Sequence, residues 1–507
     1  MEKIFIDGLN LKIEDVIKVT REGALVELKE EAKEKINLSR KKVEEIIKNP
    51  QAVYGINTGF GKFCNVKISE NEGKILQKNL IMSHSCGVGN PLPGDIVKGI
   101  MLLRANALSR GNSGIRLSTV ETIIEMINKN VVPVVPEKGS LGASGDLAPL
   151  SHVALVIMGM GEAFYNGERM TGNKAMEKAG IKPVELTEKE GLALINGTQV
   201  MTSVGVHAIY DSLKILRISD IAAALTMEAL QGITDAFDER IHELRGQSGQ
   251  IRTAKNLRNI LSGSSNVTRQ GELRVQDAYT LRCVPQIHGA SKDALEYVYN
   301  VLEKEINAVT DNPIIFPETD DVISGGNFHG QPVAIAMDFL GIAVSELGNV
   351  SERRTERLVN PALSGLPAFL AENGGLNSGF MIAQYSAASL VSENKVLAHP
   401  ASVDSIPSSA NQEDHVSMGT IAARKAKEIA FNVNKILSIE ILTACQAIDI
   451  RNASDKLSDT CRNVYERIRK EISYMDCDRV LYPDIEKVSE IIFEKSFNDE
   501  ILVNISA

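Results

Sequence analysis

Apolar residues recur at three- and four-residue spacing over long stretches of the second half of the chain. Between Ser417 and Ile450 they fall on one stripe, formed by Ala422, Ala426, Ile429, Val433 and Ile436. This spacing is typical of a helix with one buried face. Similar proline-free patterns run from Val206 to Ile233, from Val333 to Val359 and from Phe380 to Leu397. Helices of this length usually pack side by side, so the pattern predicts a mainly α protein built on a long-helix bundle.

The N-terminal part of the chain has a different pattern. Over residues 1–110, short apolar stretches alternate with glycine turns such as GINTGFGKF and CGVGNPLPGD. We therefore expect a smaller mixed domain over 1–110 and a helical domain over 111–507. No regular alternation of strands and helices is visible, which argues against a doubly wound nucleotide-binding fold.

Composition and charge exclude several kinds of partner. Of the 507 residues, 43% are apolar and 24% are charged, the usual mixture for a soluble globular protein. The formal net charge is −10 and there is no long basic stripe, so we expect no nucleic-acid partner. The N-terminus lacks the order of a secretion signal, and no run of about 18 apolar residues indicates a membrane span.

Cysteine and histidine spacing gives little sign of a disulfide framework or a metal site. The six cysteines are far apart and form no CxxC pair, which fits reduced thiols in a cytoplasm. The eight histidines contain no HExxH pair, so we expect no metal ion.

The stretch GSLGASGDLAPL, residues 139–150, has an unusual glycine spacing. It fits neither the GxSxG nucleophile elbow, nor the GxGxxG dinucleotide loop, nor the phosphate loop. A remaining possibility is that the loop reacts with itself. The unhindered nitrogen of Gly145 would attack the Ala143 carbonyl, and Ser144 would lose water, which leaves an electrophilic ring.

The residues after this loop predict a helix from Leu147 through HVALVIMGM. Asp146 is placed to cap it, and Pro149 falls in the first turn, where proline is tolerated. The N-terminus of such a helix would stabilise negative charge that develops on the ring. On spacing alone, a flexible turn before a capped core helix explains the same residues equally well.

Seven stretches identify the chain as similar to the aromatic amino acid ammonia-lyase family, and in particular to members that act on histidine. In the family's order they are YGINTGFGKF (54–63), LIMSHSCGVG (80–89), GSLGASGDLAPLSH (139–152), LINGTQ (194–199), RVQDAYTLRCVPQ (274–286), GGNFHGQP (325–332) and NQEDHVSM (411–418). The resemblance implies an ammonia-lyase/aspartase-like helical fold, and a carbon–nitrogen lyase activity that releases ammonia from an L-amino acid. It also implies a homotetramer whose active sites combine residues of several subunits.

The resemblance assigns the catalytic groups. Ala143, Ser144 and Gly145 would form the 4-methylidene-imidazol-5-one (MIO) group, with no external cofactor. Tyr54 or Tyr279 would remove the β-proton. Arg282 would hold the substrate carboxylate, which suits its planar, permanently charged guanidinium. The remaining contacts to substrate or ring are implied for Asn196, Gln276 and Phe328.

Some of these residues also have plainer explanations from the sequence. Gln276, Tyr279 and Arg282 recur at a spacing that could place them on one helical stripe, and such a stripe is often only a solvated face. Tyr54 could anchor a turn, and an asparagine before Gly-Thr, such as Asn196, commonly does so.

Two positions bear on the substrate. His84 and Glu413 match the residues that hold an imidazole in family members acting on histidine, since both can hydrogen-bond to that ring. The implied reaction converts L-histidine to trans-urocanate, the opening step of histidine breakdown. His84 could instead be a core histidine and Glu413 a loop charge or helix cap. The alternatives are a tyrosine-specific lyase, an aromatic aminomutase, or a non-catalytic helical assembly protein whose loop never cyclises.

Overall fold

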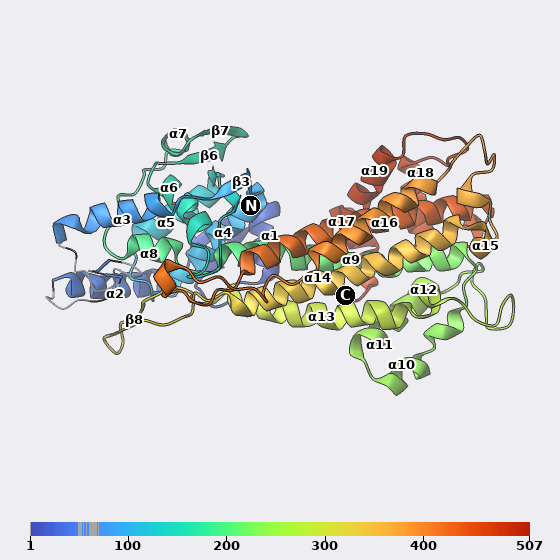
Figure 1. The fold of residues 1–507 in the computed structure, drawn as a ribbon, viewed down its shortest axis with the longest axis horizontal. Coiled ribbons are helices and arrows are strands. Elements are labelled where there is room, and N and C mark those ends of the chain that lie inside the picture. Colours follow the sequence, from blue (N-terminus) through green and yellow to red (C-terminus); the bar gives the residue numbers. More distant parts are fainter. Residues whose placement is uncertain (1, 49–52, 54, 57, 60–67, 69) are drawn as a thin grey trace. The chain divides into compact units, whose positions relative to one another are not determined.

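The computed structural model describes residues 2–48, 53, 55–56, 58–59, 68 and 70–507 (Figure 1). The chain forms two compact units. Unit 1 comprises Met1–His207, Tyr299–Asp338 and Pro400–Arg424, and unit 2 comprises Ala208–Val298, Phe339–His399 and Lys425–Ala507. The domain boundary predicted near residue 110 lies inside unit 1, directly after α4, and stays a prediction.

Unit 1 combines helices with short strands. Its helices are α1 (Ile13–Arg21), α2 (Glu30–Ile47), α3 (Glu70–His84), α4 (Gly94–Ser109), α5 (Leu117–Asn128), α6 (Leu147–Ile157), α7 (Gly172–Lys178) and α8 (Glu190–Ile195). Its strands are β1 (Lys3–Ile6), β2 (Leu25–Leu28), β3 (Val88–Pro91), β4 (Val132–Pro133), β5 (Pro136–Lys138), β6 (Glu162–Tyr165), β7 (Glu168–Thr171), β8 (Ile314–Phe316) and β9 (Asp321–Ile323). All strands that the structure describes belong to this unit.

The strands form four small sheets. β1 and β2 pair in parallel, with Lys3 opposite Leu25, whereas β3–β5, β4–β6–β7 and β8–β9 are antiparallel. β3 follows α3 directly, and β5 leads into the loop before α6. Their pairing therefore brings the end of α3 close to that loop.

Helix α4 forms the core of unit 1. Its side chains are buried nearly all round, as in Ile96, Leu102 and Leu108, and α1, α2 and α5 pack against it. Such a helix has no solvent-facing stripe. Arg104 is buried in the same helix, and its partners are described with the site below.

Four long helices begin in one unit and end in the other: α9 (Gln199–Ala229), α13 (Val284–Glu305), α14 (Gln331–Val359) and α17 (Gly419–Ile450). The helices that lie wholly in unit 2 are α10 (Glu239–Arg245), α11 (Ser248–Ile260), α12 (Tyr279–Arg282), α15 (Pro361–Ser364), α16 (Met381–Leu397), α18 (Asp459–Glu471), α19 (Tyr482–Phe493) and α20 (Lys495–Glu500).

Within unit 2, the long helices pack side by side (Figure 1). Gly348 of α14 allows a close approach to α17, since a Cβ there would lie 3.1 Å from both Ile436 and Val433. Thr226 of α9 donates a hydrogen bond to Glu440 of α17 at 2.8 Å. The predicted mainly α fold with a long-helix bundle is confirmed.

Among the residues that the structure describes, one helix is apolar and long enough to cross a membrane by length and composition alone. An 18-residue window of α14 has a mean hydropathy of 1.5. It is not an unbroken apolar run, because Asp338 and Glu346 interrupt this part of the helix. However, 72% of that window is buried inside the protein, as in the core helix of a helical bundle.

Candidate active site

Residues 139–145 form a tight loop directly before α6. Gly139, Gly142 and Gly145 have positive φ angles of 135°, 70° and 77°, which glycine adopts at no steric cost. A Cβ added at Gly145 would lie 2.1 Å from the carbonyl oxygen of Gly197. Position 145 therefore requires glycine both for its backbone conformation and for its contact with the segment that follows α8.

A distant part of the chain, residues 413–420, also contacts this loop, and we call it the loop-binding segment. Ser417 donates its hydroxyl hydrogen to the carbonyl oxygen of Gly142 at 3.1 Å. Glu413, at the start of the segment, accepts a hydrogen bond from Ser144 Oγ at 2.7 Å. The predicted electrophile-forming serine and the predicted substrate-recognising carboxylate are thus direct neighbours.

The Glu413 side chain is half-buried and is held at both carboxylate oxygens. Oε1 accepts from Ser144, and Oε2 accepts from Ser408 Oγ at 3.0 Å. The backbones of Ser408 and Glu413 bond to each other in both directions, at 2.9 and 3.3 Å. The turn between them contains Ser409 and Ala410 with positive φ angles of 50° and 53°. Non-glycine residues in this conformation carry strain, which is often found at functional sites.

Asn196 follows α8 directly and is buried. Its backbone carbonyl accepts a hydrogen bond from Arg104 Nη1 at 2.7 Å, and its Nδ2 donates to the Asn312 carbonyl at 3.2 Å. Burial lowers the pKa of Arg104 to about 10. The side-chain oxygen Oδ1 of Asn196 is buried and has no partner among the described residues. A buried acceptor without a donor costs about 1–3 kcal/mol, so this oxygen is available to a further group at the site.

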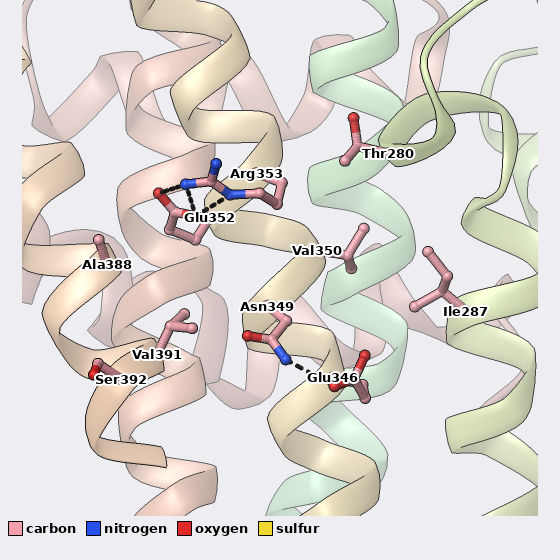
Figure 2. A pocket seen from close by; sticks show the side chains of 10 residues that line it. All are labelled: Thr280, Ile287, Glu346, Asn349, Val350, Glu352, Arg353, Ala388, Val391 and Ser392. Carbon is pink, nitrogen blue, oxygen red and sulfur yellow. Dashed lines mark hydrogen bonds and ion pairs between the residues drawn. The ribbon is translucent and has the colours of Figure 1, made fainter. Parts of the chain in front are cut away.

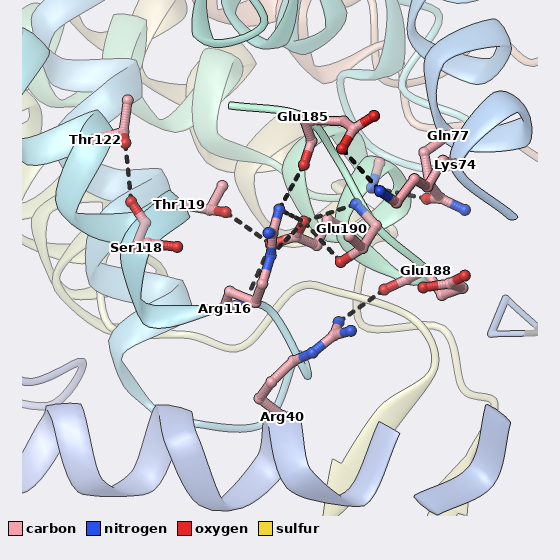
Figure 3. Close-up of polar contacts among 12 residues, drawn as sticks. Arg40, Lys74, Gln77, Arg116, Ser118, Thr119, Thr122, Glu185, Glu188 and Glu190 are labelled. Carbon is pink, nitrogen blue, oxygen red and sulfur yellow. Dashed lines mark hydrogen bonds and ion pairs between the residues drawn. The ribbon is translucent and has the colours of Figure 1, made fainter. Parts of the chain in front are cut away.

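Glu190, the first residue of α8, is tied to the start of α5 (Figure 3). Arg116 donates to its Oε2 from Nε and Nη2 at 3.0 and 2.5 Å, and Thr119 donates to Oε1 at 2.7 Å. Burial raises the pKa of Glu190, but the hydrogen bonds and charge of Arg116 outweigh burial and leave this pKa below its usual range. A charged carboxylate also suits a helix N-terminus. Because α8 ends immediately before Asn196, this ion pair helps to position that asparagine.

His84 is the last residue of α3. Its Nδ1 lies 2.8 Å from the carbonyl oxygen of Leu80, which requires a hydrogen on Nδ1. In the neutral ring Nε2 is then an acceptor, and it makes no hydrogen bond with the rest of the described chain. The adjacent Ser85 donates to Ser151 of α6 at 3.1 Å. The end of α3 is therefore joined to the helix that follows the serine loop.

Phe328 is half-buried and lies in the segment just before α14. The ring of the next residue, His329, stacks on His415 with centroids 5.5 Å apart. A Cβ at Gly330 would lie 3.1 Å from Ser417 Oγ. Both contacts place the Phe328 segment beside the loop-binding segment.

The buried carboxylate of Asp146 links the serine loop to two other segments. It accepts hydrogen bonds from the backbone N–H groups of Val200 and Met201 at 3.0 and 2.9 Å, from Ser140 Oγ at 2.7 Å, and from the Thr420 hydroxyl. Burial raises the pKa of Asp146, and these hydrogen bonds oppose the increase. The N–H groups belong to the first turn of α9, which has unpaired donors and a partial positive charge.

The prediction that the Asp146 side chain caps α6 is wrong. Asp146 occupies the capping position of α6, but its side chain makes no hydrogen bond to that helix. A capping side chain bonds to the second or third N–H of a helix, and the third residue of α6 is Pro149, which has none. The carboxylate caps α9 instead.

Gln276, Tyr279 and Arg282 lie in unit 2. The Arg282 guanidinium carbon is 4.5 Å from the centroid of the Tyr279 ring, and Tyr279 is 69% exposed. The predicted helical stripe is wrong for Gln276. Ala278 is extended, with φ −62° and ψ 159°, so that α12 begins only at Tyr279 and Gln276 precedes it in irregular backbone.

Most of the other predicted residues lie in unit 1. Glu413 is hydrogen-bonded to Ser144 of the loop formed by Ala143, Ser144 and Gly145. Asn196 precedes Gly197, which pairs with Gly145. His84 and Phe328 lie on segments bonded to these elements. Tyr54 lies outside the described residues, so its predicted role as a base stays a prediction.

Sequence reasoning missed several supporting residues, among them Arg104, Glu190 and Ser417. Arg104 and Ser417 bond to the backbone of Asn196 and of Gly142, from positions far away in the chain. Glu190 lies six residues before Asn196 and pairs with the distant Arg116. Glu190 and Ser417 fall next to or inside matched motifs, which was the only available signal. Arg104 has no such signal, because a single arginine in an apolar helix does not reveal its partner.

Unit 2 contains an open pocket of about 540 Å³, which is lined by residues other than those of the predicted site (Figure 2). It is lined by Thr280, Ile287, Glu346, Asn349, Val350, Glu352, Arg353, Ala388, Val391 and Ser392. Arg353 donates to Glu352 at 2.5 and 2.6 Å, and Asn349 donates to Glu346 at 2.7 Å. These four side chains are thus paired with one another, whereas Thr280 Oγ1 is buried and has no partner among the described residues. No predicted site residue that the structure describes lines the pocket.

Comparisons with known proteins agree with the motifs. The family described as aromatic amino acid lyase matches residues 11–470. A protein named histidine ammonia-lyase from Alkaliphilus oremlandii is 63% identical over 493 residues, 97% of either chain. Another of the same name, from Caldanaerobacter subterraneus subsp. tengcongensis, is 62% identical over 492 residues, again 97% of either chain. The chain therefore belongs to the aromatic amino acid lyase family and is a carbon–nitrogen lyase.

Solved structures show the same fold. The histidine ammonia-lyase of Trypanosoma cruzi is 43% identical with a TM-score of 0.92, over 99% of this chain and 95% of that one. The tyrosine aminomutase of Streptomyces globisporus is 38% identical with a TM-score of 0.93, over 97% and 96% of the two chains. The expected ammonia-lyase type of helical fold is confirmed.

Proposed function

We propose that the protein is a histidine ammonia-lyase, which converts L-histidine to trans-urocanate and ammonia. Family membership and relatives of that name at 62–63% identity support this activity. The observation that carries it is the 2.7 Å contact between Ser144 and Glu413. The contact supports the proposal, because it joins a carboxylate suited to an imidazole ring to the serine from which the electrophile would be made.

The residues around Ser144 fit a self-formed MIO group. The attacking nitrogen belongs to Gly145, which has no side chain to obstruct it and whose positive φ of 77° already bends the loop. The buried Asn196 Oδ1 has no partner and could serve a polar group of the ring or substrate. Once formed, the ring supplies an electrophile that activates the substrate for loss of ammonia. No external cofactor is needed in this proposal.

His84 and Glu413 would recognise the side chain of the substrate. His84 Nδ1 is occupied by the Leu80 carbonyl, so Nε2 can accept the N–H of an imidazole. The Glu413 carboxylate can accept a second ring hydrogen and stabilise positive charge on the ring. A phenol or phenyl side chain offers no such pair of donors, which favours histidine.

The remaining groups bind and deprotonate the other end of the substrate. Arg282 would hold the carboxylate, with Gln276 nearby in sequence, and Phe328 would pack against the ring. The β-proton would go to Tyr54 or Tyr279. We further propose a cytoplasmic homotetramer in which other copies of the chain contribute to each site. Exposed apolar side chains of unit 2, such as Phe431 at 57% exposure, support burial against another copy.

A tyrosine-specific lyase or an aromatic aminomutase is the second candidate. Tyrosine aminomutases share the fold at 37–38% identity, lower than the relatives named histidine ammonia-lyase. The family resemblance implies a histidine at the position of His84 in tyrosine-specific members too, so Glu413 is the stronger discriminator. A panel of L-histidine, L-tyrosine and L-phenylalanine, followed by the ultraviolet absorbance of each unsaturated acid, tests the choice. Histidine should react and Ser144→Ala should be inactive, whereas a preference for tyrosine would overturn the substrate assignment.

A further inference from the structure

We propose that Glu413 also acts earlier, as the acid that expels the Ser144 hydroxyl while the ring is being made. In the newly folded chain, its carboxyl group would donate the proton that turns this hydroxyl into departing water. The proposal rests on the proposed function, because it concerns how that enzyme acquires its electrophile. It gives Glu413 a task in maturation that is separate from substrate binding.

The geometry singles out Glu413 for this task. Its Oε1 lies 2.7 Å from Ser144 Oγ, and both side chains are half-buried. Within the described part of the chain, it is the only titratable group hydrogen-bonded to that hydroxyl. The contact joins residues 269 positions apart, so it forms only when unit 1 has folded. Ring formation would then be coupled to folding of the site.

Glu413 is also held in place for proton transfer. Ser408 bonds to its second carboxylate oxygen at 3.0 Å and to its backbone on both sides. On the loop itself, Ser417 fixes the carbonyl of Gly142, two residues before Ser144. Donor and acceptor are therefore positioned by separate hydrogen bonds, as efficient general acid catalysis requires.

Asp146 is the other carboxyl group near the loop, but it is already engaged. Its two oxygens accept four hydrogen bonds, from Val200, Met201, Ser140 and Thr420. Proton donation to Ser144 would break this arrangement. Asp146 is thus a positioning residue, and Glu413 is the group that touches the reacting atom.

The chemistry requires an acid at this oxygen, because hydroxide leaves poorly. Ring closure removes the Ala143 oxygen as one water, with hydrogens from the backbone nitrogens of Ser144 and Gly145. In the second dehydration, the Ser144 Cα–H bond breaks and its electron pair forms the Cα=Cβ double bond. The Cβ–Oγ bond breaks with its pair remaining on Oγ, which in this proposal takes a proton from the protonated form of the Glu413 side chain and leaves as water.

After this step, Glu413 has lost its proton and can bind the imidazole ring of the substrate. The Cα proton passes to solvent water, and no oxidant or reductant is consumed. Glu413 ends as a carboxylate whose Oε1 has lost its serine partner. That oxygen is then available to accept a hydrogen bond from the imidazole of the substrate.

The test is the intact mass of freshly made full-length chain, followed over time after cell-free synthesis. Wild-type protein should become lighter than its encoded mass by two water molecules. Glu413→Gln keeps the shape of the side chain and one acceptor oxygen, whereas its NH2 group is a donor in place of the second oxygen and cannot supply the proton of a carboxylic acid. It should lose the second water about 100-fold more slowly, the usual contribution of a general acid, and accumulate chains lighter by at most one water.

Three further variants make the result decisive. Ser144→Ala provides the reference mass of a chain in which no ring forms. Asp414→Asn removes the adjacent exposed carboxylate and should mature like wild type. Glu413→Asp keeps the acid and should mature faster than Glu413→Gln. Circular dichroism and native mass establish that each variant is folded. Loss of both waters by Glu413→Gln at a rate within about tenfold of wild type would overturn the proposal. Wild-type protein that loses no water would instead overturn the proposed function.

Discussion

The carbonyl oxygen of Gly197 occupies the place that a side chain at Gly145 would need. A Cβ at residue 145 would lie 2.1 Å from this oxygen, and the two glycines form a parallel bridge. The N–H of Asp146 donates to the same oxygen at 2.7 Å. The loop that we propose forms the electrophile is thus held directly against the segment that begins with Asn196.

Substitution of Gly145 tests this contact. Gly145→Ala should block ring closure, because the methyl group meets backbone atoms that cannot move aside, and activity should fall at least about 100-fold. The chain should retain the mass of both waters. Gly167→Ala is the matched control: its φ is also positive, at 80°, but no atom lies within 4 Å of the added Cβ. It should cost only about 1 kcal/mol of backbone strain and mature normally. Equal behaviour of the two variants would contradict the role of the Gly197 contact.

The ion pair at the start of α8 predicts a pH-dependent stability. The folded-state pKa of Glu190 lies below its ordinary value of 4.5 because the Arg116 interactions outweigh burial. Its ionisation therefore adds stability above that value, and this contribution is lost as the pH falls through the folded-state pKa. Glu190→Gln should destabilise the protein by about 3 kcal/mol at neutral pH, with a smaller difference below pH of about 4.

Urea unfolding at several pH values and one protein concentration measures this difference. Glu188→Gln changes a carboxylate two residues away and serves as the control (Figure 3). If the loss of unfolding free energy in Glu190→Gln stays constant from neutral to acid pH, the charge of Glu190 is not the source of the effect.

The hydrogen bonds of Asp146 predict that its variants and those of its partners lose stability in proportion to the number of bonds removed. Asp146→Ala removes the acceptor of four hydrogen bonds and should lower the free energy of unfolding by about 3 kcal/mol. Thr420→Val removes one donor and should cost about 1 kcal/mol. Both can be measured by urea unfolding. Similar small losses in the two variants would mean that the carboxylate does not hold the start of α9.

Substrate recognition predicts a specific kinetic change at His84. His84→Phe removes the free Nε2 acceptor, so kcat/KM for L-histidine should fall about tenfold, mainly through KM. Ser83→Ala removes only the hydroxyl beside Nδ1, at 3.1 Å, and should remain close to wild type. Steady-state kinetics of the two variants separate recognition of the imidazole from support of the ring. An unchanged KM in His84→Phe would remove His84 from the substrate site.

The long helices could be predicted closely from the sequence because their apolar stripes are uninterrupted. The pattern predicts a helix over 380–397, and α16 spans Met381–Leu397. Helix α9 was predicted from Val206 but begins at Gln199. Its first turn contains the buried apolar residues Val200 and Met201, but the start of the helix is capped by Asp146, more than fifty residues earlier in the chain. The local spacing of apolar residues cannot predict a helix cap that is provided by a residue far away in the sequence.

The site was less accessible to sequence reasoning than the fold. The spacing of GASG suggested a reactive loop, but nothing local connects Ser144 with Glu413, 269 residues away. Family resemblance supplied both positions without their mutual contact. The stripe of Gln276, Tyr279 and Arg282 failed because the extended Ala278 delays the start of the helix.

Elimination of ammonia from L-histidine is tested by measuring the amounts of ammonia and of urocanate that form in the same reaction. We expect equal amounts of the two products with wild-type protein and neither product with Ser144→Ala. Consumption of an aromatic amino acid with little free ammonia and a β-amino acid as product would identify an aminomutase. No turnover of L-histidine by folded wild-type protein whose mass has dropped by two waters would contradict the proposed activity.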